Sequence, residues 1–120
     1  MGLDIFVHSV NRSNPEDSIE INYFRKVNFL AYFFNPRNCM PFEARKELLE
    51  DLKDRCDKVL QAKDAKVSQE LLRTQEGFFF GSTEYDEDYY YEVQKVFDFL
   101  NELLPNFDFE NRKVEFYFWW

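Results

Sequence analysis

Hydrophobic and polar residues alternate along residues 3–10, at the start of the sequence. A period of two residues is typical of a β-strand. Residues 113–119 are rich in the β-branched and aromatic residues that strands favour. The pattern predicts a strand in each segment, and the second strand is expected to pair with the first or with the segment around Phe78. The two faces of the first strand carry Leu3, Ile5 and Val7 on one side and Asp4, Phe6 and His8 on the other.

Three internal stretches repeat their apolar residues every three or four positions, which is the period of a helix. The first stretch predicts a helix over residues 22–34, with Asn22 as its amino-terminal cap and an extended lead-in at Ile19 and Ile21. The dipeptide at residues 35–36 is expected to end this helix, because the residue before a proline avoids the helical region. Its apolar positions are Phe24, Val27, Leu30, Ala31 and Phe34.

The second and third helices are predicted over residues 42–62 and 85–104. Pro41 suits the start of the second helix, Ser82 or Thr83 suits the cap of the third, and Pro105 is expected to end the third. The apolar stripe of the second helix is Leu48, Leu52, Cys56, Val59 and Leu60, and that of the third is Tyr89, Val93, Val96, Phe97, Leu100 and Leu104.

The order of these elements predicts an α+β fold. Three helices lie between two terminal strands, so we expect them to pack on a small sheet formed by both ends of the chain. Residues 1–120 suffice for one hydrophobic core, and we therefore expect a single domain.

Composition narrows the class of protein. Hydrophobic residues make up 45% of the sequence and aromatic residues 20%, which excludes a disordered chain. No apolar run approaches the roughly 20 residues that span a bilayer, and the amino terminus lacks the pattern of a secretory signal. We therefore expect a soluble, cytoplasmic protein without a membrane partner. Two cysteines and one histidine are too few for a disulfide framework or for a zinc or iron site, so no metal or other cofactor is predicted.

Charge is distributed unevenly along the chain. The formal net charge is −8, and residues 74–120 contain eleven acidic residues against three basic ones, whereas the acids and bases of residues 1–73 cancel. Direct binding of nucleic acid draws on Lys and Arg, so it is not expected. An acidic segment favours approach to a basic protein surface. The alternative is that the acids keep an aromatic-rich protein soluble.

Five acids of this segment share one face of the predicted third helix with one tyrosine. A turn of about 100° per residue places them on the face opposite the apolar stripe, together with Lys95. We predict that this face binds a basic partner and that Tyr91 is its central anchor. The alternative is a merely solvated helix face. The candidate partner-binding residues are Glu84, Glu87, Asp88, Tyr91, Asp98 and Glu102.

Motifs for catalysis are not apparent. The acids of residues 84–88 lack the spacing of a calcium loop, and their position at a helix start accounts for them. Gly77 and Gly81 bracket three phenylalanines, which suits a strand or tight turn, but the segment is not a phosphate-binding loop. Ser82 lacks the surroundings of a nucleophile elbow. We therefore predict no catalytic residues and no enzyme activity.

Three segments of the chain resemble a family of small, mostly uncharacterised proteins encoded by phages and prophages. They are residues 1–4 (MGLD), residues 23–26 (YFRK) and, most specifically, residues 77–87 (GFFFGSTEYDE) followed by Tyr89. The resemblance implies a mobile genetic element, whose small acidic proteins often inhibit host machinery. It therefore implies a non-enzymatic inhibitor of a basic host protein, most specifically an anti-CRISPR protein acting on a Cas nuclease or its guide-RNA complex, which hold nucleic acid in basic channels.

Two other functions stay open at this point. The first is a structural or accessory phage protein that acts as a homo-oligomer through its aromatic carboxyl end. The second is an enzyme with an acidic active site. Stoichiometric inhibition without turnover, concentration-dependent self-association and metal-dependent turnover would distinguish the three hypotheses.

Overall fold

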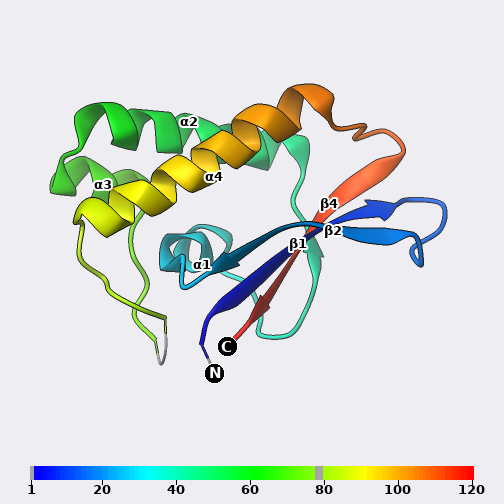
Figure 1. The fold of residues 1–120 in the computed structure, drawn as a ribbon, viewed down its shortest axis with the longest axis horizontal. Coiled ribbons are helices and arrows are strands. Elements are labelled where there is room, and N and C mark those ends of the chain that lie inside the picture. Colours follow the sequence, from blue (N-terminus) through cyan, green and yellow to red (C-terminus); the bar gives the residue numbers. More distant parts are fainter. Residues whose placement is uncertain (1, 78–79) are drawn as a thin grey trace.

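The computed structural model describes residues 2–77 and 80–120, and it confirms the predicted α+β class (Figure 1). The sheet has four antiparallel strands in the order β2-β1-β4-β3. The strands are β1 (Asp4–Asn11), β2 (Ser18–Arg25), β3 (Phe42–Glu43) and β4 (Arg112–Trp119). The helices in the described residues are α1 (Asn28–Phe34), α2 (Lys46–Ala62), α3 (Ala65–Leu71) and α4 (Glu87–Asn106).

The two terminal strands pair with each other, as expected. Asp4 lies opposite Trp119 and Asn11 lies opposite Arg112, so β1 and β4 are in register over their whole length. The alternative partner for β4, the segment around Phe78, involves residues 78–79, which lie outside the described residues. The strand bounds agree with the predicted ranges 3–10 and 113–119 to within one residue.

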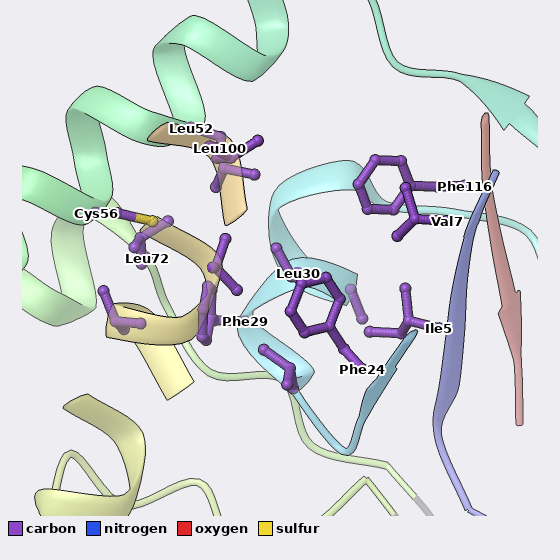
Figure 2. Close-up of a cluster of buried hydrophobic side chains, with 14 of the residues drawn as sticks. Ile5, Val7, Phe24, Phe29, Leu30, Leu52, Cys56, Leu72, Leu100 and Phe116 are labelled. Carbon is purple, nitrogen blue, oxygen red and sulfur yellow. The ribbon is translucent and has the colours of Figure 1, made fainter. Parts of the chain in front are cut away.

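One face of the sheet carries the hydrophobic core. Ile5, Val7, Phe116 and Phe118 alternate along β1 and β4 and are at most 2% exposed. Figure 2 shows Ile5, Val7 and Phe116 pointing from the strands toward α1, which lies between the sheet and helices α2 and α4. Burial of such side chains stabilises a fold by roughly 1.5–3 kcal/mol each. The helices therefore cover one face of the sheet and leave the other face to β1, β2 and β4 side chains.

The first predicted helix begins later than expected, because residues 22–25 belong to β2. Phe24 pairs with Ile5 across the β1–β2 hairpin, and strand pairing overrides the helical spacing of the apolar residues here. Lys26 then adopts a left-handed conformation, with φ 59°, and its backbone N–H donates to the Leu3 carbonyl at 2.8 Å. The helix ends at Phe34 as predicted, with Asn35 in the left-handed cap conformation.

The second predicted helix also begins too early, at residue 42 instead of Lys46. Phe42 lies opposite Phe116 in the sheet, and the Ala44 N–H donates to the Val114 carbonyl at 2.9 Å, so this segment forms the edge strand β3. At the start of the apolar stripe of α2, Leu49 is buried, whereas the predicted Leu48 is 39% exposed. The helix ends at Ala62 as predicted.

The sequence pattern missed α3, so the prediction of three helices was wrong. Six of the seven residues of α3 have some exposed surface, and a short, largely polar helix gives little hydrophobic periodicity. A cap defines its start, because the Asp64 carboxylate accepts the Lys66 backbone N–H at 2.9 Å.

The third predicted helix corresponds to α4, with both ends shifted by two residues. Asp86 is the cap, because its carboxylate accepts the Tyr89 N–H at 3.0 Å, so neither Ser82 nor Thr83 is. Pro105 does not end the helix. It lies in the last turn, where it removes one N–H donor, and the Phe107 N–H still closes that turn on the Leu103 carbonyl. The buried side chains of α4, all within the predicted stripe, are Tyr89, Val93, Val96 and Leu100.

Candidate functional site

Helix α4 presents five of the six candidate residues on one exposed face. Glu87, Asp88, Tyr91, Asp98 and Glu102 are all exposed and lie on the side of α4 away from the core. We call these residues, together with Glu84 in the preceding loop, the α4 acidic face. Glu87 and Asp88 occupy the first turn, where negative charge interacts favourably with the helix dipole by about 0.3–1 kcal/mol each. The structure therefore brings together the residues that the sequence selected.

Tyr91 is the most exposed of the large hydrophobic side chains in the described chain, at 66%. The ammonium group of Lys95, one turn further on, lies 5.5 Å from the centre of the Tyr91 ring. This cation–π contact partly orients the ring. The sequence had placed Lys95 on this face but had not paired it with Tyr91, so the centre of the face is a Tyr–Lys pair surrounded by carboxylates.

The carboxylates of the α4 acidic face differ from two of the α2 carboxylates in their partners. On α2, Asp51 and Asp54 pair with Arg55 and Lys58 one turn away, at 3.1 and 2.9 Å. Within residues 2–77 and 80–120, no ion pair involves a carboxylate of the α4 acidic face. Asp98 accepts a hydrogen bond from the neutral amide of Gln94 at 2.8 Å. The α4 acidic face therefore keeps its negative charge available to an external cation.

Glu92 is a further carboxyl group of α4 that the sequence analysis did not select. It lies between the core stripe and the exposed face. Its pKa is raised to about 7, chiefly by burial; Lys95 lowers the pKa, and Asp88 and Asp86 add smaller upward contributions. Its position beside Val93 and one turn after Asp88 is the signal that could have identified it. Glu92 therefore changes its charge near neutral pH, next to the α4 acidic face.

The segment before α4, which includes the motif at residues 77–87, is attached to the core by Asn28. The side-chain amide of this buried residue donates to the carbonyls of Phe80 and Ser82, at 3.1 and 2.9 Å, and its oxygen accepts the Gln75 N–H at 3.2 Å. Gly81 has φ 91°, a conformation that favours glycine. Phe78 and Phe79 of the expected strand or turn lie outside the described residues.

Two tyrosines continue this attachment into α4. The Tyr89 hydroxyl donates to the Leu72 carbonyl at 2.7 Å, and burial raises the pKa of Tyr89 well above its usual value. The hydroxyl of Tyr85 accepts the Thr74 N–H at 3.3 Å, while the Thr74 hydroxyl donates to the Thr83 carbonyl at 3.0 Å. The structural role of these motif residues is therefore to fix the position at which α4 begins. The sequence analysis did not select Asn28. The signal that could have identified it is a polar side chain within an apolar run.

A groove of about 520 Å³ borders the carboxyl-terminal end of the α4 acidic face. Ile21, Phe99 and Leu103 contribute apolar side chains to it, and Glu102 lies on its lining. Arg112 also lines the groove, and its guanidinium donates to the Ser9 hydroxyl at 2.6 Å and pairs with Asp17 at 3.0 Å. A partner that covers the end of α4 would therefore meet an apolar surface beside the carboxylates.

The part of the chain that the structure describes holds no group of three or more His, Cys, Asp or Glu residues arranged to bind a metal ion. No helix in that part combines the length and hydrophobicity that a membrane crossing needs. Ser82 uses its hydroxyl oxygen to accept the Glu84 N–H at 3.1 Å, which is the geometry of a turn.

Comparison with known proteins finds no family model, no curated protein and no solved structure that matches this chain. The resemblance to phage-encoded proteins therefore stays a prediction from the three sequence segments.

Proposed function

We propose that this protein is a phage-encoded, non-enzymatic inhibitor that binds a basic, nucleic-acid-binding host protein through the α4 acidic face. A CRISPR-Cas nuclease, alone or with its guide RNA, is the proposed target. One observation carries the proposal: Tyr91, 66% exposed, stands among exposed carboxylates that have no ion-pair partner within the described residues. Interfaces draw most of their energy from a few aromatic or Arg anchors inside a polar ring.

The charge of the face selects the chemistry of the partner. Its carboxylates oppose nucleic acid directly but resemble a row of phosphates in sign, so they suit the Lys- and Arg-lined channel of a nucleic-acid-binding protein. The side chains project outward from a helix instead of converging on a shared point, which suits surface binding better than chemistry on a substrate. Binding in such a channel would compete with the nucleic acid that the channel normally holds.

The first experiment compares what two variants capture from a host that expresses its CRISPR systems. The test variant carries Glu87→Lys and Asp88→Lys, and the control carries Glu47→Lys and Glu50→Lys, which makes the same charge change near the start of α2. We expect the wild type and the control to retain the same basic nuclease, and the test variant to lose it. Purified nuclease should then be inhibited at a one-to-one ratio of protein to occupied site. Equal capture by all three proteins would contradict the proposal.

The second experiment removes the anchor. Tyr91→Ala should weaken binding to the captured nuclease by roughly 2 kcal/mol, chiefly by faster dissociation. Tyr32→Ala is the matched control, because Tyr32 is also an exposed tyrosine on a helix, at 49%, and it contacts Arg73 as Tyr91 contacts Lys95. Surface plasmon resonance measures both rates. Identical dissociation rates for the two variants would show that Tyr91 is not the anchor.

A further inference from the structure

A second surface of the molecule, independent of the α4 acidic face, consists of aromatic side chains on the uncovered face of the sheet. Phe6 lies opposite Tyr23 of β2 and opposite Tyr117 of β4, so these three residues share one face. Their ring centres are 5.2 and 6.1 Å apart, which makes a row across three strands. Trp119, two residues after Tyr117, extends the row and is 52% exposed. We call Phe6, Tyr23, Tyr117 and Trp119 the outer aromatic face.

Charged groups of both signs surround the outer aromatic face: Asp4 and Glu115 have partners within the chain, whereas Glu20 and Arg25 are in no ion pair within the described residues. The Tyr23 hydroxyl donates to the Asp4 carboxylate, and Asp4 lies opposite Arg25 in the hairpin. Lys113 pairs with Glu115 at 3.3 Å. The face is therefore aromatic and locally balanced in charge, unlike the α4 acidic face. Covering it would not leave Asp4 or Glu115 without a partner, which is the main cost of burying charge.

The aromatic character and the charge of the outer aromatic face indicate which kind of partner covers it. Single-stranded nucleic acid also stacks on aromatic residues of a sheet, but it needs a groove lined by several unpaired Lys and Arg residues for its phosphates, whereas this face offers Arg25 and the chain has a net charge of −8. A basic partner would prefer the unpaired carboxylates of α4. A surface that is aromatic and internally charge-balanced fits a surface of the same kind, and interfaces between identical subunits are enriched in aromatic residues.

We propose that a second copy of this chain packs on the outer aromatic face, so that two sheets stack face to face. Three strands of eight residues offer a footprint of about 26 by 14 Å at about 3.3 Å per residue and 4.8 Å per strand. This flat area, about 360 Å², is less than half of the roughly 800 Å² per partner of a standard interface, and the protruding rings add contact surface to it. The dimer is therefore reversible and forms in a concentration-dependent way.

Stacking of faces is favoured over pairing of sheet edges. The register between β1 and β2 shifts between Val7 and His8, so that Ile21 is an extra residue in the edge strand β2. Such a bulge disrupts regular pairing with another strand. The opposite edge strand, β3, has two residues. The four-stranded sheet thus has poor edges for a second copy and one open face.

Sedimentation velocity over a range of concentrations tests this dimer. We expect the wild type to shift reversibly from 14.7 kDa to twice that mass as concentration rises. Trp119→Ser and, separately, Tyr23→Ser should raise the dimer dissociation constant at least tenfold, whereas Tyr91→Ser, on α4, should leave it unchanged. Circular dichroism checks that each variant is folded. Because Tyr23 lies on the edge strand, at 41% exposure, its variant keeps the test valid if Trp119→Ser fails to fold.

Each outcome of this experiment tests the dimer and does not test the proposed function. A wild type that stays monomeric at all concentrations, or a dimer that persists unchanged in Trp119→Ser and Tyr23→Ser, would overturn the proposal. Loss of the dimer in Tyr91→Ser together with unchanged dimers in the sheet variants would move the interface to α4. Nuclease binding by a folded, monomeric Trp119→Ser protein would leave the proposed function intact, so the two proposals can fail separately.

Discussion

Asn28 shows how one buried polar side chain can hold a segment far away in the sequence. It is 3% exposed, and all three of its hydrogen bonds go to backbone groups of residues 75–82. A buried hydrogen bond contributes roughly 1 kcal/mol, and an unpaired buried group costs about 1–3 kcal/mol. The residue therefore matters more for the loop before α4 than for its own helix.

Replacing Asn28 by Leu should lower the free energy of unfolding by about 3 kcal/mol, because two carbonyls and one N–H lose their partner while side-chain volume is kept. Asn101→Leu is the control, since Asn101 is exposed on α4, and it should change stability by less than about 0.5 kcal/mol. Urea unfolding followed by circular dichroism measures both values. Equal stabilities would mean that the loop is held by other contacts.

Glu92 gives the stability a pH dependence of definite sign. Its pKa is raised to about 7 in the folded protein, above the ordinary value of 4.5, so the folded state binds more protons between these values. The favourable contribution is fully present below pH 4.5 and is lost as pH rises through 7. Because the side chain is partly exposed, solvent screening limits the effect to about 1–2 kcal/mol.

Glu92→Gln should therefore remove a fall in stability between pH 5 and pH 8 that the wild type shows. Glu87→Gln, an exposed neighbour on the same helix, serves as the control and should keep that fall. Urea unfolding at the two pH values measures the difference. The groups with lowered pKa, Asp17, Glu43 and Asp108, act at more acidic pH and do not obscure it.

Among the elements, the carboxyl-terminal ends of two helices were predicted correctly, whereas the starts of the same helices, which depend on distant strand pairing, were not. Helices α1 and α2 end where predicted, beside Asn35 and Lys63, which both adopt left-handed caps. Phe24 was assigned to a helix because its spacing fits a period of three or four, and Phe42 because it follows Pro41, which suits a helix start. Their partners, Ile5 and Phe116, are distant in sequence, and no local pattern reveals such a pairing.

The candidate site was likewise predictable only in part. The α4 acidic face followed from helical periodicity, because a long amphipathic helix fixes which side is exposed. The missing ion-pair partners of its carboxylates and the raised pKa of Glu92 depend on the three-dimensional neighbourhood. The attachment of the motif to Asn28 spans about 50 positions of the chain, as its hydrogen bonds show.

Strand β4 is the element on which the fold depends most. It pairs with both β1 and β3 and contributes Phe116 and Phe118 to the core. Deleting residues 116–120 should abolish the cooperative thermal transition, since large buried aromatic areas are lost together with the ladder. Deleting Trp120 alone removes its ring contact with Phe80 and should only lower the melting temperature. A truncated protein with an unchanged transition would show that β4 is an appendage.

At the scale of the whole molecule, the α4 acidic face and the outer aromatic face lie on opposite sides of the core. Helix α4 packs through Phe99 on Phe24 of the core face of the sheet, and the outer aromatic face is on the reverse of the same strands. A stacked dimer would therefore display two acidic helices outward. The concentration of negative charge on one side also gives the molecule a strong electrostatic asymmetry.

This asymmetry should make association with the target fast and sensitive to salt. We expect the association rate to fall steeply as ionic strength rises from about 0.01 to 0.15 M, where the screening length shrinks from about 30 to 8 Å. The Glu87→Lys and Asp88→Lys double variant should associate most slowly at low salt, while its dissociation rate changes less. Stopped-flow measurements at several salt concentrations test this. A rate that does not depend on salt would exclude steering by α4.

The place of β4 in the sheet also constrains how the protein is made. The strand that completes the sheet is the one translated after every other described element, and it lies at the centre between β1 and β3 (Figure 1). A nascent chain that has not yet been extended through residue 119 can form the β1–β2 hairpin. Its β1 strand, with Ile5 and Val7, still lacks β4 as a neighbour. Its folding depends on contacts between distant segments, which form slowly. Ribosome-bound chains stalled before residue 112 should therefore be digested by protease, and chains extended well beyond residue 119 should resist it.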